Sequence, residues 1–248
     1  MDGLLQSRRE NLCGILNGID TAVFDPAVDP LLTVNYDAER FKMKVQNKLA
    51  LQKELGLKQD ADIPMIGMVS RLSGQKGLDL VECVFEAIMN TGAQFVVLGM
   101  GESKYIDLFS WAQWRYGGQV SACFQMNEPL AHKIYGSCDM FLMPSMFEPC
   151  GLSQLIALRY GTLPIVRETG GLRDTVLAYN EYTGDGNGFT FFNYNAHDML
   201  HVIEGAVKMY NEDRETFSNL AIRAMNGQYG WDLSAQTYME LYEKLCED

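Results

Sequence analysis

Six apolar runs of strand length, most of them separated by helical stretches, constrain the fold of this chain more than any other feature. The runs are Pro64–Val69, Gln94–Leu98, Val120–Phe124, Met140–Met143, Leu163–Val166 and Phe189–Phe192. Such runs, with little polar alternation, are typical of parallel strands that are buried on both faces. Their alternation with helical stretches predicts an α/β fold: an open parallel sheet with helices on both faces.

The remaining segments are expected to be helical or extended. Apolar residues recur at helical spacing after the first run, at Leu78, Val81, Val84 and Ile88, which predicts a helix with one buried face. Residues 37–57 predict a charged helix ending near Gly56, and residues 196–248 predict three helices as a C-terminal extension. Turn formers dominate residues 1–34, which predicts an extended arm.

Composition excludes several classes of protein. The chain has 248 residues, 47% of them hydrophobic, so disorder is not expected. No apolar run approaches the roughly 20 residues that span a bilayer, and no signal peptide is recognisable, so no membrane is expected as a partner. The net charge of −12 disfavours nucleic acid. Six cysteines without a CxxC pair indicate a reducing compartment such as the cytoplasm.

Ligands of open α/β sheets bind beyond the carboxyl ends of the strands, so the loops there are the candidate sites. The loop after Val69 holds Arg71 and Lys76 in a Gly/Ser-rich turn before a helix, a setting that favours an anion. Solvated surface cations are an equally good interpretation. The loop after Leu98 holds Gly99 and Gly101, but Lys104 stands where a dinucleotide fingerprint needs its third Gly.

Three further loops carry candidate residues. Phe124 ends its strand and either stacks on a base or packs in the core. In the next loop, Glu148 and Gly151–Ser153 precede or open a helix, so the carboxylate either accepts bonds from sugar hydroxyls or stabilises the helix N-terminus. Cys150 lacks a partner histidine and is interpreted as a ligand contact or an inert thiol. Thr169–Gly171 opens another helix.

No metal site is expected. His197 and His201 have the spacing of helical metal ligands, but the rest of a ligand set is missing, so they are interpreted as a solvated face.

Four sets of motifs together resemble bacterial glycogen synthase and plant starch synthase over nearly the whole chain. They are Ile15–Asp20, Val69–Leu72 with Gln75–Asp79, Phe147–Leu155, and Thr169–Leu172 with Asp174–Val176. The resemblance implies a GT-B fold, in which two Rossmann-like domains face each other across a cleft. It implies that residues 1–36 are an interdomain arm and residues 37–248 the C-terminal, nucleotide-sugar-binding domain, with the N-terminal acceptor domain absent.

The resemblance also implies a reaction, in which glucose passes from ADP-glucose to an α-1,4-glucan with retention of configuration. ADP is the product, and no cofactor is needed. Arg71 and Lys76 would bind the pyrophosphate and Glu148 would orient the glucose, as the catalytic residues. The implied substrate-binding residues are Gly99, Gly101, Phe124 (against the adenine), Cys150 (near the glucose), Gly151, Leu152 and Ser153 (at the phosphates), Thr169, Gly170 and Gly171. A bacterial-type cytoplasmic location is implied, with a plastid form as the alternative.

Some positions depart from the family pattern. Met146 stands where the family often has Arg, Ser153 where it commonly has Thr or Asn, and Ile156 where the broader retaining pattern has a second Glu. The last departure is normal for the glycogen synthase branch.

Other functions stay open from the residues alone. A GT-B transferase that uses a UDP- or GDP-sugar is one alternative. A non-catalytic glucan-binding module is another, with Trp111, Trp114 and Trp231 as its candidate platforms, although helix packing is the simpler explanation for Trp111 and Trp114. A dehydrogenase is disfavoured by the missing third Gly.

Overall fold

The computed structural model describes residues 2–247 and contains one parallel sheet of six strands. The strands are β1 (Met65–Val69), β2 (Gln94–Leu98), β3 (Val120–Cys123), β4 (Met140–Met143), β5 (Leu163–Arg167) and β6 (Phe189–Phe191). Their order is β3-β2-β1-β4-β5-β6, and every neighbouring pair is parallel. This is the doubly wound order of Rossmann folds. The predicted sheet and its six strands are confirmed.

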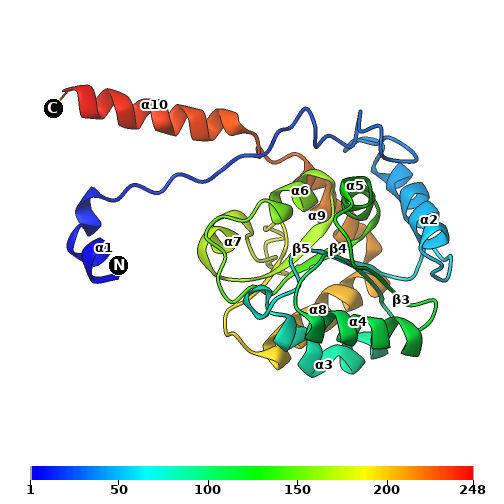
Figure 1. Cartoon of the computed structure of the whole chain (residues 1–248). Coiled ribbons are helices and arrows are strands. Elements are labelled where there is room, and N and C mark those ends of the chain that lie inside the picture. The colour runs from blue at the N-terminus through cyan, green and yellow to red at the C-terminus, as the bar shows by residue number, and fades with distance from the viewer. Residues whose placement is uncertain (1, 248) are drawn as a thin grey trace.

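Both faces of the sheet are buried, which is why the strands read as continuous apolar runs. Ile66 and Met68 of β1 belong to one core cluster, and Met65 belongs to the other. The first cluster lies under α3 (Leu78–Asn90), α4 (Ser103–Arg115) and α8 (Ala196–Glu212). The second lies under α2 (Lys44–Glu54), α5 (Glu128–Ser137) and α6 (Ser153–Arg159). Figure 1 shows α3, α4 and α8 on one side of the sheet with α5 and α6 on the other.

The remaining helices are α1 (Asp2–Ser7), α7 (Gly170–Thr175), α9 (Arg214–Met225) and α10 (Trp231–Glu247). The helix predicted over 37–57 begins late, because the Asp37 carboxylate accepts the Arg40 amide and a 3-10 turn over Phe41–Met43 precedes Lys44. Its predicted end near Gly56 and the three C-terminal helices are confirmed.

The N-terminal arm is held to the domain by buried polar contacts. Asp29 accepts the Tyr160 hydroxyl at 2.5 Å and lies 2.7 Å from Nδ1 of His132. The Tyr36 hydroxyl donates to the Tyr160 carbonyl at 2.8 Å. The arm is extended as predicted between about residues 12 and 19, but α1 was not predicted within it. Figure 1 shows α1 and α10 projecting away from the sheet and its helices.

No helix within residues 2–247 is both long and apolar enough to cross a membrane.

Candidate functional site at the switch point of the sheet

The strand order reverses between β1 and β4, and this reversal positions the site. Connections from these two strands leave toward opposite faces, and open α/β sheets form their ligand crevice at the carboxyl ends of such strands. The loop after β1 carries Arg71 and Lys76, and the loop after β4 carries Glu148. Two loops that the sequence predicts as sites therefore flank the same crevice.

An ion pair joins the two loops across this crevice. Nζ of Lys76 lies 2.5 Å from Oε2 of Glu148, and the side chains are only 20% and 11% exposed. The Ser145 hydroxyl donates to the same carboxylate oxygen at 3.3 Å. Lys76 ends a 3-10 turn over Gly74–Lys76. The ammonium and the carboxylate thus neutralise each other at a place where a ligand with both phosphates and hydroxyls would meet both groups.

Arg71 reaches the second loop through Gln75. The exposed Arg71 guanidinium donates to Oε1 of Gln75 at 3.0 Å, and the Gln75 carbonyl accepts the Met146 amide at 2.9 Å. Nε2 of Gln75 lies 3.5 Å from the Phe147 carbonyl. Gln75 was not among the predicted site residues, although it lies within one of the quoted motifs.

Close backbone packing explains the presence of Gly99 and Gly101, in addition to any role in binding. A Cβ at Gly99 would lie 1.8 Å from the Ser70 carbonyl oxygen, and one at Gly101 would lie 2.0 Å from that of Leu72. The Leu72 amide also donates to the Met100 carbonyl at 2.8 Å. Side chains at these two positions would push the loop after β2 away from the loop after β1, which carries Arg71.

Gly170 and Gly171 bring α7 against the loop that carries Glu148 in the same way. The Gly171 amide donates to the Glu148 carbonyl at 3.1 Å, and a Cβ on Gly170 would lie 2.1 Å from that oxygen. Thr169 is the N-cap residue of α7, half-buried and without a side-chain cap bond.

At the start of α6, some groups are exposed and others are held by contacts within the chain. Cys150 is half-buried, Gly151 is left-handed with φ 71° and Leu152 is exposed. The first amides of a helix have no intrahelical acceptor, so the amides of this turn are available as donors. The Ser153 side chain is hydrogen-bonded to Tyr135. Burial raises the pKa of Tyr135 to about 12, and the bond to Ser153 opposes that rise.

Two aromatic expectations meet different outcomes. Phe124 is half-buried against the core, which favours the packing interpretation, whereas Met126 in the same loop is 93% exposed.

The helix-packing explanation for Trp114 is wrong, because this side chain is 79% exposed. The buried face of α4 is made by Tyr105, Phe109 and Ala112, so the tryptophans lie on the other face, and Trp111 is partly exposed as well.

The histidines of α8 are both exposed, as predicted. Within residues 2–247, no group of His, Cys, Asp or Glu side chains is arranged to hold a metal ion.

Two further residues contact the loops of this site but were not among the predicted site residues: Nη1 of Arg167 donates to the Met146 carbonyl, and the Tyr194 hydroxyl lies 3.3 Å from the Gly74 carbonyl. Arg167 is the last residue of β5, so the rule that sites lie at the carboxyl edge would have found it. Tyr194 belongs to no motif, and only the fold brings it to this edge.

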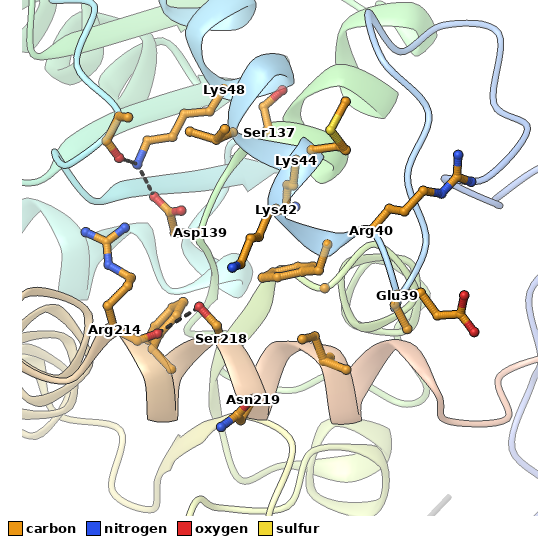
Figure 2. Close-up of a pocket in the computed structure, with 18 of the residues that line it drawn as sticks. Glu39, Arg40, Lys42, Lys44, Lys48, Ser137, Asp139, Arg214, Ser218 and Asn219 are labelled. Carbon is orange, nitrogen blue, oxygen red and sulfur yellow. Dashed lines mark hydrogen bonds and ion pairs between the residues drawn. The ribbon is translucent and has the colours of Figure 1, made fainter.

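A cavity of about 1100 Å³ lies at the opposite edge of the sheet, lined by α2 and α9. Figure 2 shows Lys48 pointing toward Asp139 there, and their atoms are 2.7 Å apart. Arg214 stacks 3.3 Å from the centroid of the Tyr210 ring. These charged groups are committed to interactions within the chain, and none of the predicted site residues lies here.

The doubly wound sheet, with an ion pair at its switch point, defines a Rossmann-like domain whose candidate ligand site lies at the carboxyl edge of the sheet. Comparison with known proteins places it more closely. Residues 50–223 match the family model for glycosyl transferases group 1. The chain belongs to this family.

Curated relatives are similar to this chain over nearly its whole length. A glycogen synthase of Clostridium acetobutylicum is 54% identical over 98% of the chain, and one of Bacillus cereus (strain B4264) is 51% identical over all of it. The chain spans about half the length of these curated relatives, 51% and 52% respectively.

Solved structures agree on the fold. The catalytic domain of starch synthase IV from Arabidopsis thaliana, bound to ADP and acarbose, superposes with a TM-score of 0.91 at 36% identity. That match covers 98% of this chain and 50% of the other. A sucrose-phosphate synthase from Thermosynechococcus elongatus has a TM-score of 0.66 at 18% identity, covering 99% of this chain and 56% of the other, which supports the fold alone. The predicted Rossmann-like fold of GT-B glycosyltransferases is confirmed.

Proposed function

We propose that this chain is the donor-binding domain of a retaining glucosyltransferase that extends α-1,4-glucans from ADP-glucose. The observation that carries the proposal is the Lys76–Glu148 pair at the switch point, with Arg71 in the adjoining loop. It unites cations suited to a pyrophosphate with a carboxylate suited to sugar hydroxyls.

Each residue has a role in this proposal. On donor binding, Lys76 turns from the carboxylate to the pyrophosphate, where it and Arg71 stabilise the charge that develops on the departing ADP. Glu148, released from the ion pair, accepts hydrogen bonds from glucose hydroxyls. The amides around Gly151–Ser153 contact phosphate, Cys150 lies near the glucose, and Gly99, Gly101 and Thr169–Gly171 line the crevice. Phe124 contacts the adenine only at its exposed edge.

The relatives support the donor and the acceptor together. The curated relatives are glycogen synthases, and the starch synthase IV structure is described as bound to ADP and acarbose. Residues 1–36 then act as the arm toward an acceptor-binding domain, which corresponds to the half of the relatives outside this chain. A bacterial cytoplasmic location is part of the proposal, because the two glycogen synthases named above are from bacteria.

Nucleotide titration tests the donor. We expect ADP to raise the melting temperature and UDP and NAD to do so less. A ligand at 100 times its Kd adds about 2.7 kcal/mol, or roughly 5–10 °C for a domain of this size. An equal or larger shift with UDP would indicate another GT-B transferase, and no shift with any of them would contradict nucleotide binding by this domain.

The exposed tryptophans of α4 favour glucan binding at that surface as a second candidate. It predicts retention on an amylose matrix that Lys76→Ala leaves intact and Trp114→Ala abolishes. Loss of retention with Lys76→Ala alone would contradict it.

A further inference from the structure

We infer that Arg167 and Tyr194 are positioning residues, which together set the geometry of Lys76 and Glu148. The choice of ADP as the ligand rests on the proposed function, whereas the structural part of the inference does not. The pair is called the Arg167–Tyr194 clamp below.

Arg167 holds the loop that carries Glu148. It ends β5, beside β4 in the sheet, and its Nη1 donates to the Met146 carbonyl at 2.5 Å. Met146 lies two residues before Glu148. A planar guanidinium fixes the direction of such a bond more strictly than an ammonium does.

Tyr194 holds the turn that carries Lys76. Its hydroxyl lies 3.3 Å from the Gly74 carbonyl, two residues before Lys76, and 2.5 Å from Oδ1 of Asp79 on α3. Burial raises the pKa of Tyr194 well above its ordinary value, and the carboxylate of Asp79 raises it further. The hydroxyl therefore stays protonated, and it donates its single hydrogen mainly to Asp79, with the Gly74 carbonyl as the weaker second acceptor.

The two halves of the clamp meet through a cation–π contact. The Arg167 guanidinium lies 5.4 Å from the centroid of the Tyr194 ring. One continuous set of contacts thus runs from the turn of Lys76 through Tyr194 and Arg167 to the loop of Glu148. A site assembled from two loops works only if both are held in place, because small displacements weaken contacts to a ligand.

The chemistry of Arg167 argues against simple packing. Its Nε is buried without a hydrogen-bond partner, and no carboxylate within residues 2–247 forms an ion pair with its guanidinium. An unpaired buried donor is costly, and such costs are expected at functional positions. An apolar residue would fill the same space without that cost.

Two conservative variants test the clamp. Tyr194→Phe keeps the ring under Arg167 but removes both hydroxyl contacts, and Arg167→Lys keeps the charge but loses the planar donor. Arg223→Lys and Tyr182→Phe are matched controls. Arg223, on α9, also donates from Nη1 to a backbone carbonyl, that of Gly184. Tyr182 is exposed.

The first measurement needs no ligand. Amide hydrogen exchange should become about fivefold faster or more at Lys76, Gly77 and Met146 in the clamp variants, and stay unchanged along β2 and in the controls. Unchanged exchange at those three amides would overturn the clamp, whatever the domain binds.

The second measurement is a double-mutant cycle in ADP affinity. Tyr194→Phe should weaken ADP about five- to tenfold in the parent chain and less than twofold when Lys76 is already Ala, because the clamp acts through Lys76. Additive losses would show a structural effect and overturn the inference. If the parent chain binds no ADP, the proposed function fails and the exchange measurement alone decides the clamp.

Discussion

At the scale of single residues, a charged side chain has different consequences at the two edges of the sheet. Lys76 and Glu148 neutralise each other at the carboxyl edge, where we propose that a bound donor replaces each partner. Lys44 is buried at the other edge and touches only neutral acceptors, among them the Thr162 hydroxyl at 2.7 Å and the Tyr160 carbonyl at 3.0 Å. The first arrangement suits binding, and the second makes stability depend on pH.

Replacing Lys76 by Ala is expected to weaken ADP binding about 10- to 100-fold, the usual effect of losing a contact to a charged group. Isothermal titration calorimetry measures it. Lys208→Ala, on the exposed face of α8, is the control and should bind like the parent. An affinity that does not change in Lys76→Ala would contradict its role.

Because Lys44 is buried, the free energy of unfolding is expected to rise with pH. Burial lowers the pKa of its ammonium to about 7 from an ordinary value near 10.5. The unfolded chain therefore binds more protons than the folded one above pH 7, so the free energy of unfolding rises with pH, by up to about 1.4 kcal/mol per unit. Urea unfolding between pH 7 and 8.5 measures the slope. Lys44→Met should be less stable but have a smaller slope, and an equal slope would contradict this origin.

At the scale of elements, the loops of the site fit together because glycines let their backbones touch. Gly77 is the N-cap residue of α3, with φ 74°, and a Cβ there would lie 2.0 Å from the Pro144 carbonyl oxygen in the loop after β4. Gly56 has a similar φ of 69° but has no atom within 4 Å of its Cβ position. The two positions separate the effect of conformation from that of contact.

Gly56→Ala is expected to cost about 1–2 kcal/mol of stability, the penalty of a left-handed residue with a side chain. Gly77→Ala should cost about 1–3 kcal/mol more, because it also forces the two loops apart, and it should weaken ADP binding. Chemical denaturation and calorimetry measure both effects. Equal losses of stability in the two variants would show that the contact with Pro144 contributes nothing.

At the scale of the whole molecule, the domain is distinct from its two terminal extensions. Most apolar side chains of α10 are exposed, including Leu233, Met239, Tyr242 and Leu245. The Ser234 hydroxyl donates to the Leu16 carbonyl at 2.6 Å and ties the start of α10 to the arm. The stability of the domain should therefore depend little on the rest of α10.

Deleting residues 235–248, which keeps Ser234, is expected to change the melting temperature by less than about 2 °C, equivalent to less than about 1 kcal/mol for a domain of this size. Differential scanning calorimetry measures it. Phe109→Ala in the core of α4 is the contrasting variant and should cost about 3–5 kcal/mol. A comparable loss from the deletion would show that α10 packs on the domain in solution.

How far the sequence predicts the fold differs between elements. Gln94–Leu98 and Met140–Met143 were predicted to the residue, because buried parallel strands are apolar on both faces and loops end them sharply. The start of α2 was missed, because a carboxylate cap at Asp37 competes with helical bonds. Trp114 was misjudged, because an aromatic side chain on a helix carries no mark of which face it occupies.

Local patterns in the sequence are enough to predict the α/β class, the strands and the loops that carry Arg71, Lys76 and Glu148, because periodicity and glycine-rich turns are local properties of the chain. The meeting of Lys76 and Glu148 is a property of the folded chain, since their pairing spans 72 residues and depends on β1 lying beside β4. The same holds for Arg167 and Tyr194. Strand order is set by how buried faces pack against one another, and no local pattern in the chain records it.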